Sequence, residues 1–144
     1  MKKTKKQNLK SSWFLILIGL VLILAAGYFL LKPAPTQSTA LPSEVSIAEA
    51  VKLRDAGAFV LDVRQPEEWE QVHIPGATLI PLGELQARSN EVPKDVKVLV
   101  VCRSGNRSQQ GRDILINAGF SQVTSMSGGV TNWQSEGNPV VSGP

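Results

Sequence analysis

Residues 98–108 read VLVVCRSGNRS, and they are the most informative part of the chain. The first four residues, Val98 to Val101, form a short branched apolar run that predicts a buried strand. Cys102, the only cysteine in the chain, follows that run directly and opens a loop with two arginines and a glycine. A helical pattern begins at Ser108. The sequence therefore predicts a strand, a small cationic loop and a helix, in that order.

This order favours a reactive thiol over a buried structural cysteine. Backbone N–H groups in such a loop converge on the sulfur, and the N-terminus of the helix adds partial positive charge, so the thiolate form is stabilised. Gly105 permits a backbone angle that a side chain would forbid. We expect Ser108 to act as the N-cap of the helix.

The remainder of residues 43–144 alternates short apolar strands with helices. Strands are predicted at 59–61, 78–80, 98–101 and 123–126, and helices at 46–57, from Pro66, at 82–87, at 108–118 and from Gly129. This alternation predicts an α/β fold with three layers (α/β/α) and a central, mainly parallel sheet. Ligands bind such sheets outside the carboxyl ends of the strands, which is where Cys102 falls. Asp62 and Arg64 follow a neighbouring strand, and we expect them to form an ion pair that holds the loop.

Residues 1–42 have a different character, with a basic tail at 1–12, an uncharged apolar run at 13–31 and a Pro-rich linker at 32–42. The apolar run approaches the roughly 20 residues that a helix needs to span a bilayer. Five lysines precede it and one follows closely, which places the N-terminus in the cytoplasm and residues 43–144 outside. The prediction is a single-pass membrane protein with an uncleaved transmembrane helix that contacts the lipid bilayer. The alternative is a cleaved signal peptide and a secreted domain.

Composition limits the remaining possibilities. All 12 acidic residues lie at or after Glu44, against nine Lys plus Arg in the same part, so that part is near −3 although the whole chain is +3. The high overall basicity therefore gives no support for nucleic-acid binding. One cysteine permits no disulfide within the chain, and one histidine with one cysteine cannot build a tetrahedral zinc site. No cofactor or metal is expected.

Three separated segments resemble the rhodanese-like domain family. The first is LDVRQPEEW at 61–69 leading to HIPGA at 73–77, the second is the loop at 102–108, and the third is Gly128-Gly129 followed by Trp133, Gly137 and Pro139. They occur in the family's order across nearly all of residues 43–144. Val72 departs from the family, which commonly has glycine before the histidine, and we expect a tighter turn there.

The resemblance implies a sulfurtransferase. Cys102 would attack the outer sulfur of an anionic donor such as thiosulfate, become a persulfide, and pass the sulfur to a thiol or cyanide acceptor. The resemblance implies that Asp62 and Arg64 support the loop. The implied substrate-binding residues are those of the loop itself, namely Arg103, Ser104, Gly105, Asn106, Arg107 and Ser108. Both arginines would hold the anion through charge-assisted hydrogen bonds.

Two other functions remain open. A non-catalytic persulfide carrier or docking module would use the same thiol. A cysteine-dependent phosphatase or arsenate reductase shares the strand, loop and helix, but such enzymes have five residues between cysteine and arginine, and here four separate Cys102 from Arg107. Among other polar and aromatic residues, His73 is interpreted as structural, Glu67, Glu68 and Glu70 as a solvated helix face, and Trp69 and Trp133 as core.

Overall fold

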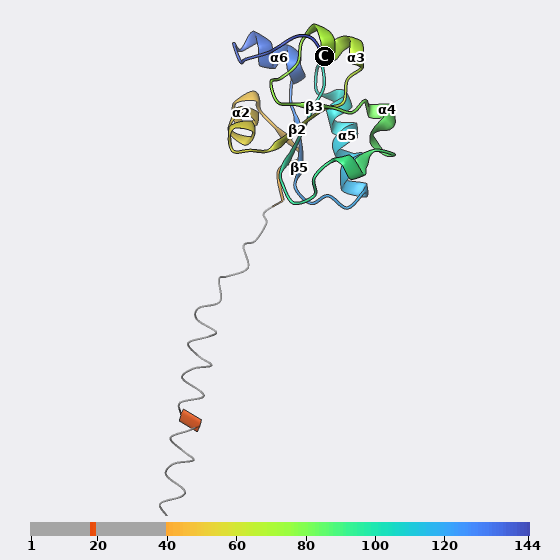
Figure 1. Ribbon diagram of the computed structural model, residues 1–144. Helices are drawn as coiled ribbons and strands as arrows, with labels where there is room; N and C mark the ends of the chain where they lie inside the picture. The colour runs from red at the N-terminus through yellow and green to blue at the C-terminus, as the bar shows by residue number, and fades with distance from the viewer. Residues whose placement is uncertain (1–17, 20–39) are drawn as a thin grey trace, which may run out of the picture. The chain divides into compact units, whose positions relative to one another are not determined.

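A five-stranded parallel sheet forms the centre of the domain in the computed structural model, which describes residues 18–19 and 40–144 (Figure 1). The strands lie in the order β1-β5-β4-β2-β3, and every neighbouring pair is parallel. Their bounds are β1 Glu44–Val45, β2 Phe59–Asp62, β3 Thr78–Leu79, β4 Val98–Val101 and β5 Val123–Met126. The central position of β4 puts its carboxyl end, and the loop that follows, in the middle of one edge of the sheet.

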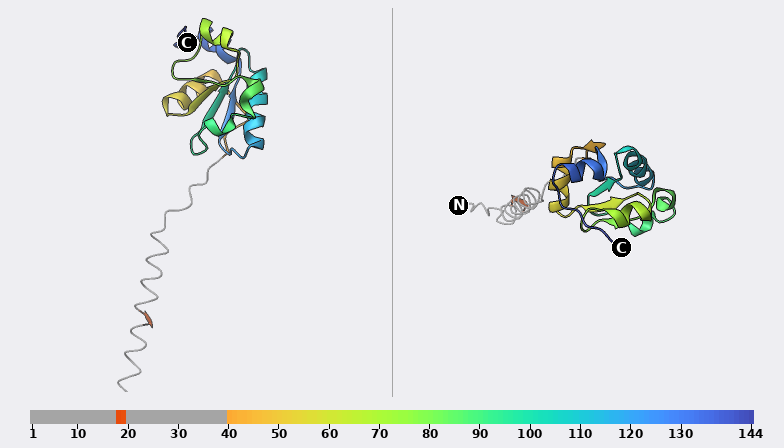
Figure 2. Two further views of the ribbon diagram at one scale, coloured as in Figure 1. Left: turned by 45° about the vertical axis from the view of Figure 1, so that its right-hand side comes forward. Right: turned by 90° about the horizontal axis from the view of Figure 1, so that it is seen from above.

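Helices cover both faces of this sheet (Figure 2). Their bounds are α2 Ile47–Asp55, α3 Pro66–Gln71, α4 Leu82–Leu85, a 3₁₀ turn Ser89–Glu91, α5 Asn106–Asn117 and α6 Gly129–Ser135. On one face α2 and α6 pack on Val60, Leu99 and Val101, and on the other α4 and α5 pack on Leu61, Val98 and Val100. Successive strand residues point to opposite faces, so both faces of β2 and β4 are buried. The α/β fold with a parallel sheet is confirmed.

The predicted elements match with local differences. The capping box of Ser46 and Glu49 is present at the start of α2. Helix α5 begins at Asn106, two residues before the predicted start, and α4 is shorter than predicted. The edge strand β1 was not predicted at all. Trp133 is fully buried as expected, whereas Trp69 is only half-buried and stacks on the His73 ring at 3.7 Å between centroids.

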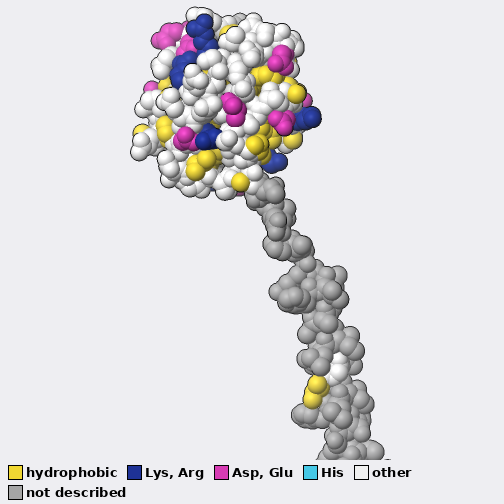
Figure 3. All heavy atoms as spheres, turned by 180° about the vertical axis from the view of Figure 1, so that it is seen from behind, with side chains coloured by type: hydrophobic (Ala, Val, Ile, Leu, Met, Phe, Trp, Pro, Cys, Tyr) yellow, Lys and Arg dark blue, Asp and Glu magenta, His cyan; other side chains and the backbone are white. Residues whose placement is uncertain are grey.

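The predicted tail at 1–12 and the transmembrane helix at 13–31 lie outside the described residues, apart from Ile18 and Gly19. Within residues 18–19 and 40–144, no helix is long and apolar enough to cross a membrane. The anchor therefore stays a prediction. On the domain face seen in Figure 3, acidic and basic side chains are interspersed among small hydrophobic areas.

Candidate active site

Cys102 lies at the carboxyl end of β4 with 1% of its surface exposed. The sequence analysis favoured a reactive thiol over a buried one, and the structure places the thiol below the surface yet against polar groups of its own loop. The backbone N–H of Gly105 donates to Sγ at 3.1 Å. Ser108 Oγ lies 3.7 Å from the same sulfur. The sulfur therefore accepts a backbone N–H at the start of helix α5.

The loop turns into α5 at Gly105. Its φ of +108° confirms the predicted need for glycine, and it is the N-cap residue of the helix. The prediction that Ser108 caps the helix is wrong, because Ser108 lies within the first turn of α5. Its buried hydroxyl instead donates to the Gly105 carbonyl at 2.6 Å. Ser108 therefore fixes the shape of the loop, while Ser104 and Asn106 are exposed on its outside.

Helix α6 braces the loop from the other side. The Val130 N–H donates to the Cys102 carbonyl at 2.8 Å, and the Thr131 N–H donates to the Arg103 carbonyl at 3.1 Å. This close approach needs Gly129, since a Cβ there would lie 2.3 Å from the Cys102 carbonyl oxygen. The sequence pattern places Gly129 in a motif but does not reveal this role, which depends on contacts between residues distant in sequence.

Asp62 and Arg64 form a buried ion pair, as expected. Arg64 Nη2 lies 2.6 Å from Asp62 Oδ2, and the two side chains are 0% and 3% exposed, Asp62 first. Arg64 Nε also donates to Asp62, and Nη2 donates to the Val72 carbonyl at 2.7 Å. The pair thus joins the end of β2 to the end of α3. Val72 itself has extended backbone (φ −164°), which valine adopts without strain.

Arg107 has a partner that the sequence did not indicate. Its two terminal nitrogens donate to the two carboxylate oxygens of Glu68 on α3, at 2.7 and 2.8 Å. The Arg107 hydrogen bonds, with a smaller contribution from the Gln65 backbone, lower the pKa of Glu68 to about 2, against burial, which acts to raise it. Glu68 in turn raises the pKa of Arg107. The interpretation of a solvated face is therefore wrong for Glu68, although Glu67 and Glu70 are exposed.

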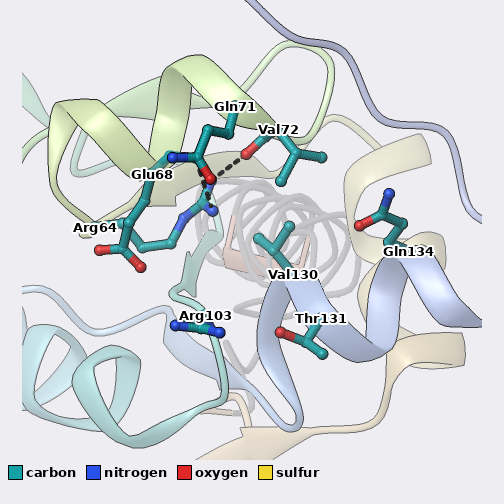
Figure 4. Close-up of a pocket in the computed structure, with 8 residues that line it drawn as sticks. All are labelled: Arg64, Glu68, Gln71, Val72, Arg103, Val130, Thr131 and Gln134. Atoms are coloured by element: carbon teal, nitrogen blue, oxygen red, sulfur yellow. Dashed lines mark hydrogen bonds between the residues drawn. The ribbon is translucent and has the colours of Figure 1, made fainter.

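Arg103 is exposed, and within the described part of the chain its guanidinium has no hydrogen-bond or ion-pair partner. It lines a cavity of about 230 Å³ beside the loop. Figure 4 shows the residues of α3 on one side of this cavity and those of α6 on the other, with Arg103 coming from the loop. The lining residues are Arg64, Glu68, Gln71, Val72, Arg103, Val130, Thr131 and Gln134.

His73 is structural, as interpreted from the sequence. It is buried, its Nδ1 lies 3.0 Å from the Trp69 carbonyl, and its backbone pairs with Val141 near the C-terminus. Among residues 18–19 and 40–144 no three His, Cys, Asp or Glu side chains are grouped closely enough to hold a metal ion. Among the described residues, the site offers one thiol, one backbone N–H donor to that thiol and one cation without a partner, Arg103.

Comparison with known families agrees with this geometry. The rhodanese-like domain family matches residues 46–136, which include the Cys102 loop, helices α5 and α6, and the Asp62–Arg64 pair. The chain belongs to the rhodanese-like domain family. Sulfur-transfer proteins recur among its relatives in this family.

A protein of Allochromatium vinosum named sulfurtransferase is 37% identical over 83 residues, covering 58% of this chain and 78% of the relative. The thiosulfate sulfurtransferase GlpE of Pseudomonas entomophila is 37% identical, covering 63% and 84%. A Bacillus subtilis protein with the provisional name sulfur carrier protein YrkF is 38% identical, covering 62% of this chain, which spans about half of its length. The crystal structure of a rhodanese-related protein from Thermoplasma volcanium superimposes with a TM-score of 0.65 at 32% identity, covering 69% of this chain and 98% of that one.

Proposed function

We propose that this protein is a sulfurtransferase that carries sulfane sulfur as a persulfide on Cys102. In the first step the Cys102 thiolate attacks the outer sulfur of a donor such as thiosulfate. An S–S bond forms to Sγ, the S–S bond of the donor breaks, and sulfite leaves with the electron pair. In the second step an acceptor thiolate or cyanide attacks the outer sulfur of the persulfide, and Cys102 leaves as the thiolate.

The contact between the Gly105 N–H and Sγ is the observation that carries this proposal. Both half-reactions begin or end with a thiolate on Cys102, so a donor placed on Sγ favours both. The Cys102 and Arg103 carbonyls accept N–H groups of α6, so both carbonyls have partners other than the sulfur. The loop therefore presents the Gly105 N–H to the sulfur, while α6 binds the Cys102 and Arg103 carbonyls.

A persulfide carrier is the second candidate, since one relative is named as a sulfur carrier. A carrier would accept sulfur on the same thiol and release it only to a specific protein partner. A phosphatase is less favoured. Four residues separate Cys102 from Arg107, and the guanidinium of Arg107 is already held by Glu68 at two points, so the loop lacks a free arginine at the position that would clamp a phosphate.

Mass spectrometry of the intact chain tests the proposal. After incubation with thiosulfate, we expect Cys102 to gain the mass of one sulfur atom, and that sulfur to be lost on addition of cyanide or a small thiol. The Cys102→Ser variant is the control, and it should gain nothing. Persulfide that forms but reaches neither cyanide nor small thiols would favour the carrier. No persulfide from thiosulfate or from any persulfide donor would refute both.

We also propose that the domain is held on the extracytoplasmic side of a membrane by residues 13–31. The support is the apolar run, with five lysines before it and Lys32 as the near positive charge after it. Protease added to intact cells or spheroplasts should then remove residues 43–144 from a membrane-bound chain. A protected C-terminus would reverse the orientation, and a shortened soluble product would indicate signal-peptide cleavage.

A further inference from the structure

The charged groups in and near the cavity beside the Cys102 loop are unequally available to a ligand; Arg64, Glu68 and Arg103 line it, and Arg107 does not. Arg64 is occupied by Asp62 and the Val72 carbonyl. Arg107 is occupied by both oxygens of Glu68. Arg103 lines the same cavity with no partner among the described residues. Among the described residues that line this cavity, which we call the mouth of the site, Arg103 is therefore the one cation without a partner.

Glu68 produces this state, because it both lines the cavity and neutralises Arg107. Its carboxylate accepts two hydrogen bonds from the Arg107 guanidinium. A sulfonate or thiosulfate would need the same bidentate geometry to bind Arg107. The Glu68 side chain is 28% exposed and that of Arg107 is 32% exposed, so both charged groups are in contact with solvent. The Glu68 carboxylate therefore already occupies the two Arg107 nitrogens that an incoming anion would need.

We propose that Glu68 is a specificity-determining residue that selects donors by charge. Because Glu68 holds Arg107, Arg103 is the available cation. The site therefore prefers a small persulfide with a net charge of −1 over thiosulfate, whose charge is −2. The Arg103 guanidinium would bind the single carboxylate of such a donor, and the neutral side chains of Gln71, Thr131 and Gln134 line the rest of the cavity.

The step resembles the one above and rests on the proposed function. The Cys102 thiolate attacks the outer sulfur of the donor persulfide, an S–S bond forms to Sγ, the donor's own S–S bond breaks, and the donor thiolate leaves with the electron pair. Only the charge of the donor changes. Electrostatic free energy is proportional to ligand charge, so removing the Glu68 charge should act on a dianion twice as strongly, on a logarithmic scale, as on a monoanion.

Glu68→Gln provides the test in the full-length chain kept in a mild non-ionic detergent. The amide retains an oxygen for the Gln65 N–H and removes the charge. We compare kcat/KM for thiosulfate and for cysteine persulfide, whose net charge at neutral pH is −1. In the variant, the efficiency with thiosulfate should rise roughly tenfold and that with cysteine persulfide roughly threefold. Glu67→Gln is the matched control, since Glu67 is exposed, carries the same charge and lies outside the cavity lining.

A second readout does not depend on sulfur transfer. Iodoacetate and iodoacetamide alkylate the same thiol, but iodoacetate carries one more negative charge. The rate with iodoacetate divided by the rate with iodoacetamide therefore reports the electrostatic potential near Cys102. Glu68→Gln should raise this ratio roughly threefold, and Glu67→Gln should leave it unchanged. Equal acceleration of both reagents would mean that the variant merely opens the site, and would overturn the proposal.

Melting curves verify that the variants fold, and Glu68→Ser replaces Glu68→Gln if the glutamine variant does not. An unchanged alkylation ratio, or equal gains for the two donors, would overturn the role of Glu68 alone. Failure of every donor to form a persulfide on Cys102 would overturn the proposed function, and the alkylation ratio would still decide the role of Glu68.

Discussion

Replacing Arg64 by methionine should cost a large fraction of the stability of the domain. The guanidinium makes close contacts with both oxygens of Asp62 and with the Val72 carbonyl, and neither charged side chain is more than 3% exposed. Methionine fills much of the space but leaves the Asp62 carboxylate buried without a counter-ion. Breaking a buried pair in this way costs about 3 to 5 kcal/mol, against a total stability of about 5 to 15 kcal/mol.

Urea unfolding followed by tryptophan fluorescence measures the loss, since Trp133 is fully buried in the native state. With a slope of about 1.5 kcal/mol per M, the midpoint should fall by about 2 to 3 M. Arg88→Met is the matched control. Arg88 pairs with Glu84 and Glu91 on the surface, where its side chain is 39% exposed and solvent screens the pairs, so its loss should lower the urea midpoint far less than the loss of Arg64.

A double variant separates the charge from the packing. Asp62→Asn together with Arg64→Met removes both charges, so its loss should be smaller than that of Arg64→Met alone. If Arg64→Met lost no more than Arg88→Met, the pair would contribute no more than a surface contact. The reasoning that it anchors the end of β2 to the end of α3 would then be wrong.

Three further outcomes follow from the site. Cys102→Ser should abolish persulfide formation yet keep the melting temperature within a few degrees, since a serine hydroxyl can also accept the Gly105 N–H; turnover within tenfold of the native chain would show that another group is the nucleophile. Gly129→Ala should destabilise the domain by about 3 kcal/mol or more, because the new Cβ would overlap the Cys102 carbonyl. Gly137→Ala is the control, since Gly137 also has a positive φ but has open space around it, and it should cost about 1 kcal/mol. Equal melting temperatures for the two variants would refute the close approach at Gly129. Because the pKa of Glu68 is lowered in the fold, its stabilising contribution is present above its unfolded value of 4.5 and is lost as the pH falls toward about 2, so acid titration of stability should be shallower in Glu68→Gln.

The sequence predicted those parts of the fold that depend on local pattern. The apolar runs at 59–61 and 98–101 become the central strands β2 and β4, because a short run buried on both faces has few alternatives in an α/β chain. Strand β1 escaped prediction since two residues show no periodicity and exist as a strand only by pairing with β5. The start of α5 was misplaced because Gly105, rather than a polar side chain, occupies the N-cap position.

The candidate site divides in the same way. The loop residues are close to one another in sequence, and so are Asp62 and Arg64, so both features were expected. The pair between Glu68 and Arg107 joins residues 39 positions apart, and only the packing of α3 against the loop brings them together. A hint was present in the four residues that follow Arg64, where Gln65 and Glu68 form a capping box that holds the Glu68 side chain at the start of α3. Charge alone did not reveal its partner.

Cys102 is almost fully buried, yet sulfur transfer requires a donor to touch Sγ, and the contacts around the loop indicate which part gives way. The backbone is held on both sides, by Gly105 and Ser108 at the start of α5 and by the N–H groups of α6, so moving it would break several hydrogen bonds at once. The side chains of Arg103 and Ser104 are exposed, and within the described residues neither makes a hydrogen bond. Their movement therefore breaks no side-chain hydrogen bond or ion pair, and openings of this kind lie at the low end of the free-energy scale for local motion. The loop backbone can thus hold the Gly105 N–H on the sulfur while the exposed side chains of Arg103 and Ser104 move.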